Sequence, residues 1–472
     1  MASPLFRRFA MLLMVAIAAR AVTFGNPILH VDEEFYFVTA RAMLDGLVPY
    51  VDLWDRKPIG LFLIYVPAAA LGYPLGVWGY QLLALAAVVG TALCIARLAD
   101  RAGWQRGATL AGVAYILFLG FADGQGGQAP IFYNLPMAIA ALLIAPGPHD
   151  SDAAARWRRG LGAMALVGLA LQIKYSAVFE GAFFGLWWLW RDWRLGGSLT
   201  RALLRAIPLA LAAFVPTLAA WGWYVAHGAG DAFVFANFTS ILSRGSDPRH
   251  EQLRNIKWMS AMLGPLLILA ILSRRETPAS RFVGAWTIAA LTAVVVFGSW
   301  FNHYALPVMA PAAAAAAGWI GAHRRVSIAL LCVAFVTGQA LMYKKRLSRG
   351  SPAQFAELTR AVGHGPESLY LYSGSPMIYA STGRPWLTRY IFPTHLQFQR
   401  ERGAVGVDQQ AEVERIFALR PGVVVMTAFH KGERPEMRAL ANAAVAARYR
   451  RTANVQLGRD RVAVYRLMPA AR

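Results

Sequence analysis

A dense group of charged side chains lies near the start of the chain, between two apolar segments, in HVDEEFYFVTARAMLDGLVPYVDLWDRKP (30–58). If the flanking segments enter a membrane, ionised groups beside them are costly to place and usually mark a working site. This segment is therefore the first candidate for a reaction centre. Its acidic residues are Asp32, Glu33, Glu34, Asp45, Asp52 and Asp55, and its last charges are the basic pair Arg56 and Lys57.

The first acids of this segment are suited to general base catalysis. On a helix that begins near Val31, Asp32 and Tyr36 lie one turn apart and share a face with Phe35. A carboxylate kept from bulk water has a raised proton affinity and can take a proton from a hydroxyl group. Glu33 points aside and would hold the backbone or a metal ion. The alternative is that these acids only stabilise the positive end of the helix dipole.

The composition indicates a polytopic α-helical membrane protein. The chain has 472 residues, of which 57% are hydrophobic, and its apolar runs of about 16 to 25 residues recur at membrane-spanning length. The net charge of +22 is spread over short clusters between these runs, which argues against nucleic acid as a partner. The two cysteines, Cys94 and Cys332, both lie within apolar runs, so a disulfide framework and a thiolate metal site are excluded.

Clusters of arginine between the apolar runs predict the topology. They fall in alternate turns, and the positive-inside rule places these turns and the N-terminus in the cytoplasm. We expect the first helix to be retained, although its basic start and small residues also fit a cleavable signal peptide. About eleven transmembrane helices are predicted, near residues 9–24, 75–98, 107–122, 135–146, 160–174, 176–190, 203–226, 256–273, 282–300, 304–322 and 326–343.

Two segments are expected on the outer side without crossing the membrane. Residues 59–73 are apolar, but a crossing there would invert every later turn. We therefore expect a helix in the outer interface, at the end of a catalytic outer loop over residues 25–74. The outer loop 227–255 alternates large apolar with polar residues before a basic end, which fits a lid on the lipid surface or a half-buried connector.

The composition changes after a transmembrane domain that is predicted over residues 1–343. Residues 344–472 begin with a basic cluster and are predicted to form a small soluble α/β domain. An odd number of crossings places this domain in the periplasm, where its basic character suits anionic head groups or an anionic glycolipid. The expected strands are 368–372, 423–427 and 461–467, and the expected helices are 352–362, 408–419 and 435–448.

Two lysines are placed to meet an anion at the outer boundary of the membrane. Lys57 precedes Pro58, which disfavours a helix at position 57 and leaves the ammonium at the depth of the lipid phosphates. Lys174 ends the apolar run LVGLALQIKY (166–175) on the outer side, where the orientation rule disfavours a cation. Each lysine either binds a phosphate or only extends its charge to the interface.

Polar groups on the same outer side are candidates for contacts with a sugar or phosphate. His303, in SWFNHYALP (299–307), is expected at a helix start, where it either contacts such a group or is an interfacial histidine beside Tyr304. The turn GQGGQAPIFYNLP (124–136) supplies uncharged donors and acceptors, among them Tyr133 and Asn134. Its glycines and prolines also fit a turn with no further role.

The order of these motifs resembles the C-type glycosyltransferases. D-E-x-x-Y (32–36), A-R-x-M-x-x-G (40–46) and Y-x-D-x-x-D-x-K-P (50–58) are similar to the first outer loop of that superfamily. The most similar types are the family 39 protein mannosyltransferases, the aminoarabinose transferases of lipid A and the Rgt-like bacterial membrane glycosyltransferases. Further resemblance lies in G-L-A (168–170) before Lys174, in H-Y (303–304) before Pro307 and in the tail run 370–393.

The resemblance implies a polyprenyl-phosphate sugar donor, inversion at the anomeric carbon and an active site on the outer face of the bacterial inner membrane. It implies that Asp32 deprotonates the acceptor hydroxyl, and that Glu33 positions a group or ligates a metal. It leaves open whether a divalent cation is bound, by Asp32 or Glu33. The donor-phosphate candidates are Lys57, Lys174 and His303, and the substrate-binding candidates are Tyr36, Asp52, Asp55, Arg56, Tyr133, Asn134 and Tyr304.

This chain departs from the family pattern at two places. Many relatives have a second proline after the lysine, where this chain has Ile59. The acid often found near the start of the fourth helix is replaced by the Tyr133-Asn134-Leu135 region. The second departure leaves donor recognition and any metal site open.

The leading hypothesis is an inner-membrane glycosyltransferase that moves a sugar from a polyprenyl-phosphate carrier to a periplasmic lipid, glycan or protein. The alternative is a transporter or flippase of a lipid-linked or amphipathic envelope substrate. In that case the same charged residues would line the translocation path. The sequence shows no internal repeat, and its candidate residues lie at helix ends rather than at mid-membrane depth. A third hypothesis is a scaffold whose basic outer domain binds envelope glycans.

Overall fold

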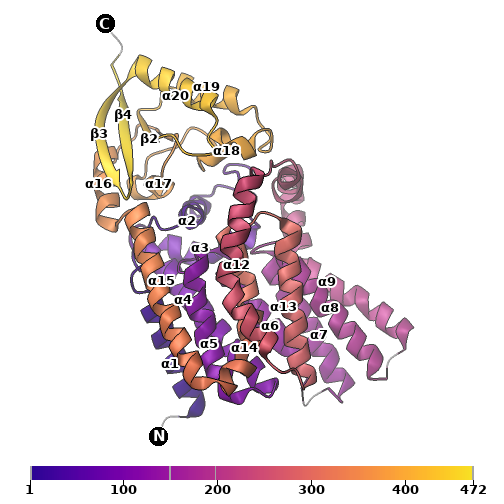
Figure 1. Cartoon of the computed structure of the whole chain (residues 1–472). Helices are drawn as coiled ribbons and strands as arrows, with labels where there is room; N and C mark the ends of the chain where they lie inside the picture. Colours follow the sequence, from indigo (N-terminus) through magenta and orange to yellow (C-terminus); the bar gives the residue numbers. More distant parts are fainter. Residues whose placement is uncertain (1–2, 148–149, 197, 470–472) are drawn as a thin grey trace. The chain divides into compact units, whose positions relative to one another are not determined.

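The computed structural model describes residues 3–147, 150–196 and 198–469. Contacts between residues divide the chain into two compact units, each built from three stretches (Figure 1). The bundle unit consists of Met1–Val22, Leu82–Ala220 and Pro248–Met342. The α/β unit consists of Thr23–Gln81, Trp221–Asp247 and Tyr343–Arg472. The expected outer loop 25–74, and residues 227–247 of the second one, therefore belong to the same compact unit as the tail.

Each of the eleven predicted transmembrane segments is a helix. Helix α15 continues seven residues beyond Met342, the last residue of the bundle unit. The helices are α1 (Pro4–Arg20), α4 (Leu75–Arg101), α5 (Gln105–Leu119), α6 (Ala129–Ile144), α7 (Ala153–Leu171), α8 (Ala177–Arg194), α9 (Leu199–Ala226), α12 (Arg249–Leu272), α13 (Pro278–Phe297), α14 (Leu306–Ala322) and α15 (Arg324–Arg349), with the short helices η1 (Gly120–Ala122) and η3 (Asn302–Ala305).

Helix α14 is the central element of the bundle unit. Its run of alanines (312–317) is fully buried and lies against α5, α12 and α13 (Figure 1). Small side chains let membrane helices approach closely and gain van der Waals contact. At the contact with α5, a Cβ on Gly107 would overlap the backbone carbonyl of Ala317, so this position requires glycine.

Seven helices in the described part of the chain are long and apolar enough to span a membrane, which makes this a multi-pass membrane protein. Helix α9 exposes Leu203, Ile207 and Leu211 along one stripe, as expected of a lipid-facing helix. The number of eleven crossings stays a prediction, because α1, α6, α7 and α8 are not among the seven. The seven segments are 75–101, 105–122, 199–226, 249–272, 278–297, 302–322 and 324–362.

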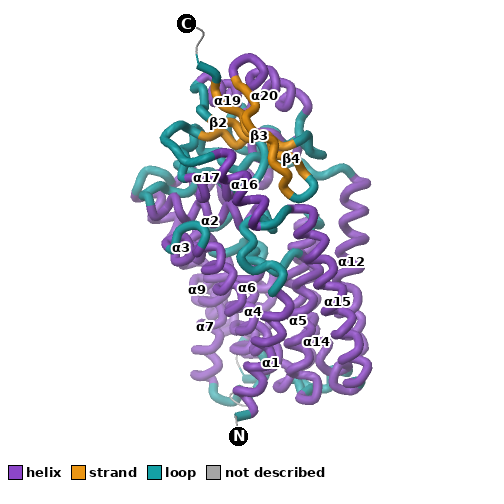
Figure 2. Tube along the Cα trace, turned by 90° about the vertical axis from the view of Figure 1, so that its left-hand side faces the viewer, coloured by secondary structure: helices purple, strands orange, loops and turns teal. Residues whose placement is uncertain are grey.

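The α/β unit combines the outer loops with the tail. Its strands are drawn in orange in Figure 2. The four-stranded sheet has the order β1-β2-β4-β3, with β1 parallel to β2 and the other pairs antiparallel. The strands are β1 (Leu369–Leu371), β2 (Val423–Thr427), β3 (Tyr449–Leu457) and β4 (Asp460–Leu467). The helices are α2 (Val31–Leu44), α3 (Ile59–Ala70), α10 (Gly230–Val234), η2 (Phe235–Thr239), α11 (Ser240–Leu242), α16 (Pro352–Val362), α17 (Met377–Thr382), α18 (Thr394–Gln397), η4 (Gln399–Glu401), α19 (Gln409–Ala418) and α20 (Pro435–Arg448).

The tail contains both helices and strands, as the sequence predicts, and has one strand more than expected. All three expected helices and all three expected strands are present. Strand β3 was not expected, because only three of its nine residues are buried and its first residue, Tyr449, is followed by Arg450 and Arg451. It is an edge strand paired with β4 alone, so it lacks the apolar alternation of a strand that covers a core.

The outer loop expected over residues 227–255 is largely helical. Residues 230–242 form a continuous helical segment from α10 to α11. Pro248 precedes the first residue of α12, so the basic end of the expected loop forms the first turns of that helix. Proline is compatible with a helix start because the first N–H groups of a helix have no hydrogen-bond partner within it. Residues 59–70 are helical as expected and belong to the shorter apolar helices.

Candidate functional site

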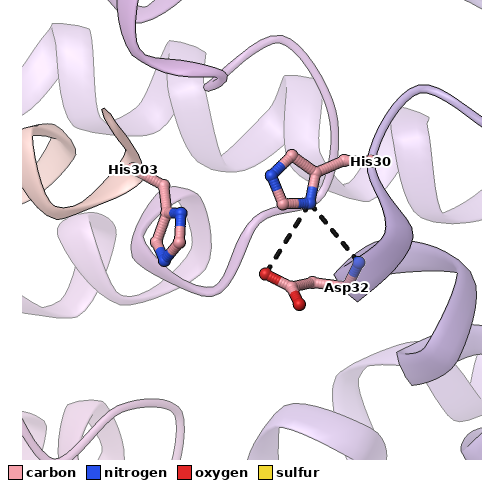
Figure 3. Close-up of side chains that lie close together, drawn as sticks. All are labelled: His30, Asp32 and His303. Carbon is pink, nitrogen blue, oxygen red and sulfur yellow. Dashed lines mark hydrogen bonds and ion pairs between the residues drawn. The ribbon is translucent and has the colours of Figure 1, made fainter. Parts of the chain in front are cut away.

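The start of α2 presents Asp32 beside His30. His30 is extended and caps the helix, with its Nδ1 accepting from the backbone N–H of Asp32 at 3.4 Å. The Asp32 carboxylate lies 3.7 Å from the same nitrogen (Figure 3). Both side chains are half-buried, whereas Glu33 and Glu34 are buried. The predicted helix start is confirmed, and among the three acids of this turn Asp32 is the one that is partly exposed to solvent.

Lys57 lies beside Asp55 and Tyr36. Its Nζ is 3.9 Å from Asp55 Oδ1 and 5.7 Å from the centre of the Tyr36 ring. The Tyr50 hydroxyl donates to the Lys57 carbonyl at 2.7 Å and so fixes the backbone immediately before Pro58. Burial raises the pKa of Asp55, the Lys57 ammonium opposes that rise, and the negative charge of Asp32 adds to it. Asp32, Asp55 and Lys57 therefore form one electrostatic group within the α/β unit.

Glu34 is a buried carboxyl group whose role the sequence did not indicate. It accepts a hydrogen bond from the Ser375 hydroxyl, and its Oε1 lies 3.7 Å from an Arg349 guanidinium nitrogen. Burial raises its pKa to about 7, because the Arg349 charge and the Ser375 hydrogen bond only partly offset the loss of hydration. It joins α2 to α17 and to the end of α15, and so fixes the helix that carries Asp32.

The Glu34→Gln variant should become more stable relative to the wild type as the pH rises. In the unfolded chain Glu34 ionises with a pKa near 4.5, against about 7 when folded. The stability that the neutral carboxyl contributes is therefore lost between these values, a change on the order of a few kcal/mol, and glutamine cannot undergo it. Thermal unfolding of the detergent-solubilised protein between about pH 5 and about pH 8 measures the difference. A constant difference across that range would contradict a raised pKa, and Glu414→Gln on exposed α19 is the control.

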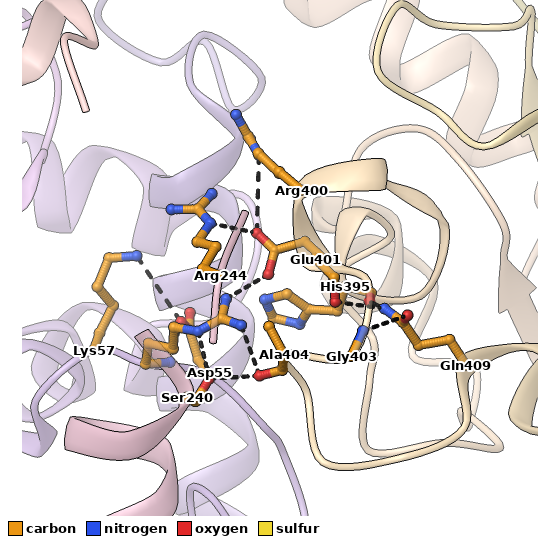
Figure 4. A network of polar contacts seen from close by, with 11 residues as sticks. Asp55, Lys57, Ser240, Arg244, His395, Arg400, Glu401, Gly403, Ala404 and Gln409 are labelled. Carbon is orange, nitrogen blue, oxygen red and sulfur yellow. Dashed lines mark hydrogen bonds and ion pairs between the residues drawn. The ribbon is translucent and has the colours of Figure 1, made fainter. Parts of the chain in front are cut away.

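Three arginines converge on one buried carboxylate, Glu401. Arg56 Nη1 is 2.6 Å from Glu401 Oε2, Arg244 Nε is 2.8 Å from Oε1, and Arg400 Nε is 3.8 Å from Oε1 (Figure 4). Arg56 also donates to Ser240 Oγ at 2.6 Å and to the Ala404 carbonyl at 3.0 Å. This network joins the first outer loop, the helical segment 230–242 and the tail. Arg56 was expected to bind substrate, but these contacts also give it a structural role.

The Glu401→Gln variant should destabilise the α/β unit. Glu401 is 2% exposed, and its removal leaves buried guanidinium groups without their counter-charge, at a cost of about 3 kcal/mol or more. Thermal unfolding and limited proteolysis should show a lower midpoint and faster cleavage in the tail. The exposed Glu414→Gln variant on α19 should behave like the wild type. A Glu401→Gln protein with unchanged stability would mean that the network is dispensable for folding.

The rings of His395 and Trp54 pack against each other next to the Glu401 network. The His395 ring meets Trp54 edge-on at 4.6 Å between ring centres. Burial, together with the charges of Arg56 and Lys57, holds the pKa of His395 well below its usual range, so the imidazole is neutral. Trp54 also belongs to the main hydrophobic core of the tail and donates its backbone N–H to the Arg389 carbonyl at 3.0 Å. Trp54, in the candidate loop, is therefore held to the tail both by its ring and by its backbone N–H.

The bundle unit brings together Lys174, Tyr304 and His303. Lys174 Nζ is 3.9 Å from the centre of the Tyr304 ring, and the His303 and Tyr304 rings are 4.9 Å apart. Lys174 follows the end of α7, with its N–H bonded to the Ala170 carbonyl, and His303 and Tyr304 lie on η3. The ring contact holds the ammonium by a cation–π interaction.

Tyr133 and Asn134 are buried at the start of α6. Asn134 Nδ2 donates to the Tyr115 hydroxyl and to the Leu306 carbonyl, each at 3.2 Å, and so ties α6 to α5 and α14. The preceding glycine turn is held by Arg20, which donates to the carbonyls of residues 124–126 at 2.6 to 3.2 Å. These contacts explain the turn without a ligand, which was the alternative interpretation of that sequence.

Two other carboxylates, Asp52 and Glu180, are held by hydrogen bonds. Asp52 accepts from the Val48 N–H at 2.7 Å and is half-buried in the turn that leads to Asp55. Glu180 on α8 is buried and accepts from Trp286 Nε1 on α13 at 2.6 Å. Glu180 was not a candidate from the sequence, although a single acid inside an apolar helix is a recognisable signal. Glu401 and Arg244 were not candidates either, because their pairing depends on the tertiary fold.

Comparisons with known proteins identify the fold. No family model and no curated protein matches the sequence. ArnT from Cupriavidus metallidurans bound to undecaprenyl phosphate is 17% identical, with a TM-score of 0.67 over 96% of this chain and 97% of that chain. An oligosaccharyltransferase from Archaeoglobus fulgidus, tethered to an acceptor peptide with the NVT sequon, is 13% identical, with a TM-score of 0.53 over 89% and 69%. The predicted C-type glycosyltransferase fold is thereby confirmed.

Proposed function

We propose that this protein is a membrane glycosyltransferase that moves a sugar from a polyprenyl-phosphate carrier to an acceptor on the outer side of a bacterial inner membrane. The observation that carries the proposal is the group formed by Asp32, Asp55 and Lys57 in the α/β unit. It occurs in a chain whose fold matches, over almost its full length, that of an ArnT with bound undecaprenyl phosphate.

Asp32 acts as the general base. Its carboxylate takes the proton of the acceptor hydroxyl while the hydroxyl oxygen forms a bond to the anomeric carbon. The bond between that carbon and the phosphate oxygen breaks on the opposite face, so the configuration inverts and the polyprenyl phosphate leaves. Glu33, buried next to Asp32, positions the start of α2.

Lys57 stabilises the negative charge that develops on the leaving phosphate. A fixed ammonium near that oxygen is worth more in a partly water-excluded site than in water. Lys174 and His303 are proposed as further donor-phosphate ligands. The substrate contacts proposed are those of Tyr36, Asp52, Asp55, Arg56, Tyr133, Asn134 and Tyr304.

His30 and Asp32 offer one imidazole nitrogen and one carboxylate oxygen at the start of α2. Magnesium in proteins often takes only one or two carboxylates and completes its shell with water and substrate phosphate, so Asp32 or Glu33 would be the protein ligand if a divalent cation binds. The steps proposed here use the side chains of the chain, and none of them is assigned to an ion.

The proposed setting is a multi-pass protein with a cytoplasmic N-terminus and the tail in the periplasm. Arginine clusters in alternate turns support this orientation. The proposed partners are the lipid-linked sugar donor, a periplasmic lipid, glycan or protein acceptor, and membrane lipids.

A reconstituted transfer assay tests the function. Purified protein is incubated with a labelled polyprenyl-phosphate sugar and, separately, with glycolipid, soluble glycan and protein fractions of the cell envelope. We expect label to enter one fraction, with release of an equal amount of free polyprenyl phosphate. Movement of intact labelled donor across a vesicle without cleavage would instead establish a flippase, and binding without either event would establish a scaffold.

A further inference from the structure

A groove of about 510 Å³ opens in the α/β unit. None of the residues that line it belongs to the arginine network of Glu401. One side comes from the first outer loop and the other from the tail. Leu47, Val51 and Asp52 line the first side. Trp386, Leu387, Thr388, Arg389, Tyr390, Val407, Glu412 and Arg415 line the second.

The polar wall of the groove is rigid. Glu412 accepts from the Thr388 hydroxyl at 2.6 Å and from two Arg415 nitrogens at 2.7 and 2.8 Å. Arg415 also donates to the Leu387 carbonyl at 2.9 Å. These bonds hold the Arg415 and Glu412 side chains in one geometry before any ligand arrives, which lowers the entropy cost of binding.

The aromatic wall is held in the same way. The Trp386 ring is half-buried and stands nearly perpendicular to Tyr379, 5.7 Å between ring centres. The Tyr390 hydroxyl donates to the Val405 carbonyl at 3.2 Å and accepts from Arg389 at 2.9 Å. The Tyr390 ring is only 4% exposed and lies under the Arg389 guanidinium, 5.1 Å from the ring centre, so the half-buried Trp386 indole supplies the aromatic surface of the groove.

The combined chemistry of these walls suits a sugar. Aromatic faces pack against the C–H faces of a pyranose ring, and hydroxyl groups need donors and acceptors side by side. The groove supplies both kinds, with two guanidinium groups (Arg389, Arg415) balanced by two carboxylates (Asp52, Glu412). Because the charges cancel, the groove favours a neutral, hydroxyl-rich ligand over a phosphate or a metal ion.

The groove is continuous with the candidate reaction loop. Asp52 lines it and lies three residues before Asp55 in the chain. The Trp54 N–H donates to the carbonyl of Arg389 at 3.0 Å, so both walls are joined by a backbone hydrogen bond. A ligand in the groove is thus held by the same loop that carries Lys57.

We propose that this groove binds the carbohydrate part of the acceptor, at sugar residues beyond the one that receives the new sugar. The proposal rests on the proposed function and names the class of its acceptor: a glycan chain, whether attached to a lipid or free. Binding there uses remote contacts to orient the reacting hydroxyl, which lowers the entropy cost of transfer.

The Trp386→Ala variant tests the groove through acceptor affinity. We expect the KM for the glycan acceptor to rise about tenfold, as loss of an aromatic contact would produce, while the KM for the polyprenyl-phosphate sugar stays unchanged. Trp386→Phe should restore most of the affinity. Phe429→Ala, which removes an exposed aromatic ring of the same unit outside the groove, is the matched control. An unchanged acceptor KM in Trp386→Ala would overturn the proposal.

A second variant covers the case in which Trp386→Ala fails to fold. Val51 is 37% exposed at the rim of the groove, so Val51→Trp fills the groove without disturbing a core. It should raise the acceptor KM, whereas Leu419→Trp at an exposed position of the tail should not. Transfer to the intact glycolipid alone would identify a lipid-attached glycan as the acceptor. Equal transfer to the lipid-free oligosaccharide released from it would show that the glycan is sufficient. Normal acceptor affinity in Val51→Trp would also contradict the proposal.

Direct binding separates failure of the groove from failure of the proposed function. Saturation-transfer NMR with the lipid-free oligosaccharide and detergent-solubilised protein needs no turnover. Wild-type binding that is lost in Trp386→Ala supports the groove even if no sugar is transferred, in which case only the proposed enzyme fails. Transfer by the wild type together with equal oligosaccharide binding by both proteins rejects the groove and leaves the enzyme intact.

Discussion

Asp32→Asn should lower the rate of sugar transfer by about 10²- to 10⁴-fold, the range that a positioned general base contributes. Asparagine keeps the size and the polar character of the side chain but cannot accept a proton. Because Asp32 is half-buried beside His30 at the helix start, the substitution should leave α2 and the membrane insertion of the protein intact. The measurement is single-turnover release of polyprenyl phosphate by purified protein.

Asp45→Asn is the matched control for this prediction. Asp45 is the C-cap of the same helix, and its side chain is 58% exposed beside Arg41. The same chemical change there should leave transfer within about twofold of the wild type, as for surface substitutions in general. If Asp32→Asn transfers sugar at the wild-type rate, another group takes the proton and the assignment of the base is wrong.

Lys57→Gln should lower kcat by about 10²- to 10³-fold, comparable to the loss of one preorganised donor to a developing anion. The substitution removes the charge that we assign to the leaving phosphate and keeps most of the side-chain length. It also removes the cation that lies 3.9 Å from buried Asp55. The carboxyl of Asp55, whose pKa burial already raises, should then hold its proton to a still higher pH.

Lys57→Arg separates charge from geometry. Arginine restores the positive charge but spreads it over a planar group that does not match the position of an ammonium. We expect it to recover part of the lost rate. Lys431→Gln, at an exposed lysine of the same unit, is the control and should be neutral. A Lys57→Gln protein with unchanged kcat and a raised donor KM would show that Lys57 binds the donor equally before and during the reaction.

Local signals in the sequence were sufficient for the secondary structure around the site. Helix α16 begins at Pro352 because Ser351 and Gln354 form a capping box, and α2 begins after His30 because a capping side chain and three acids favour that end. Strand β2 is a continuous apolar run buried on both faces. Each of these patterns acts over a few residues, so it was visible in the chain alone.

The resemblance of the first outer loop also predicted the fold correctly, because the order of motifs survives where overall identity is only 17%. Asp32 and Lys57 were identified from this loop, and the structure places them with Asp55 in one electrostatic group. The two acids at the start of α2 differ in burial. Glu33 is 2% exposed and Asp32 is half-buried, in a helix that packs against α3 and α17.

The sequence by itself determined the membrane class, most of the helices and strands and the two leading site candidates, because hydrophobic runs, caps and short motifs act over a turn or two of chain. Only the tertiary structure decided the partner of Arg56, which lies 345 residues away at Glu401, and the groove between the first outer loop and the tail. A buried charge is matched by whichever opposite charge the whole fold brings near. That choice depends on every packing contact at once and leaves no local trace in the chain.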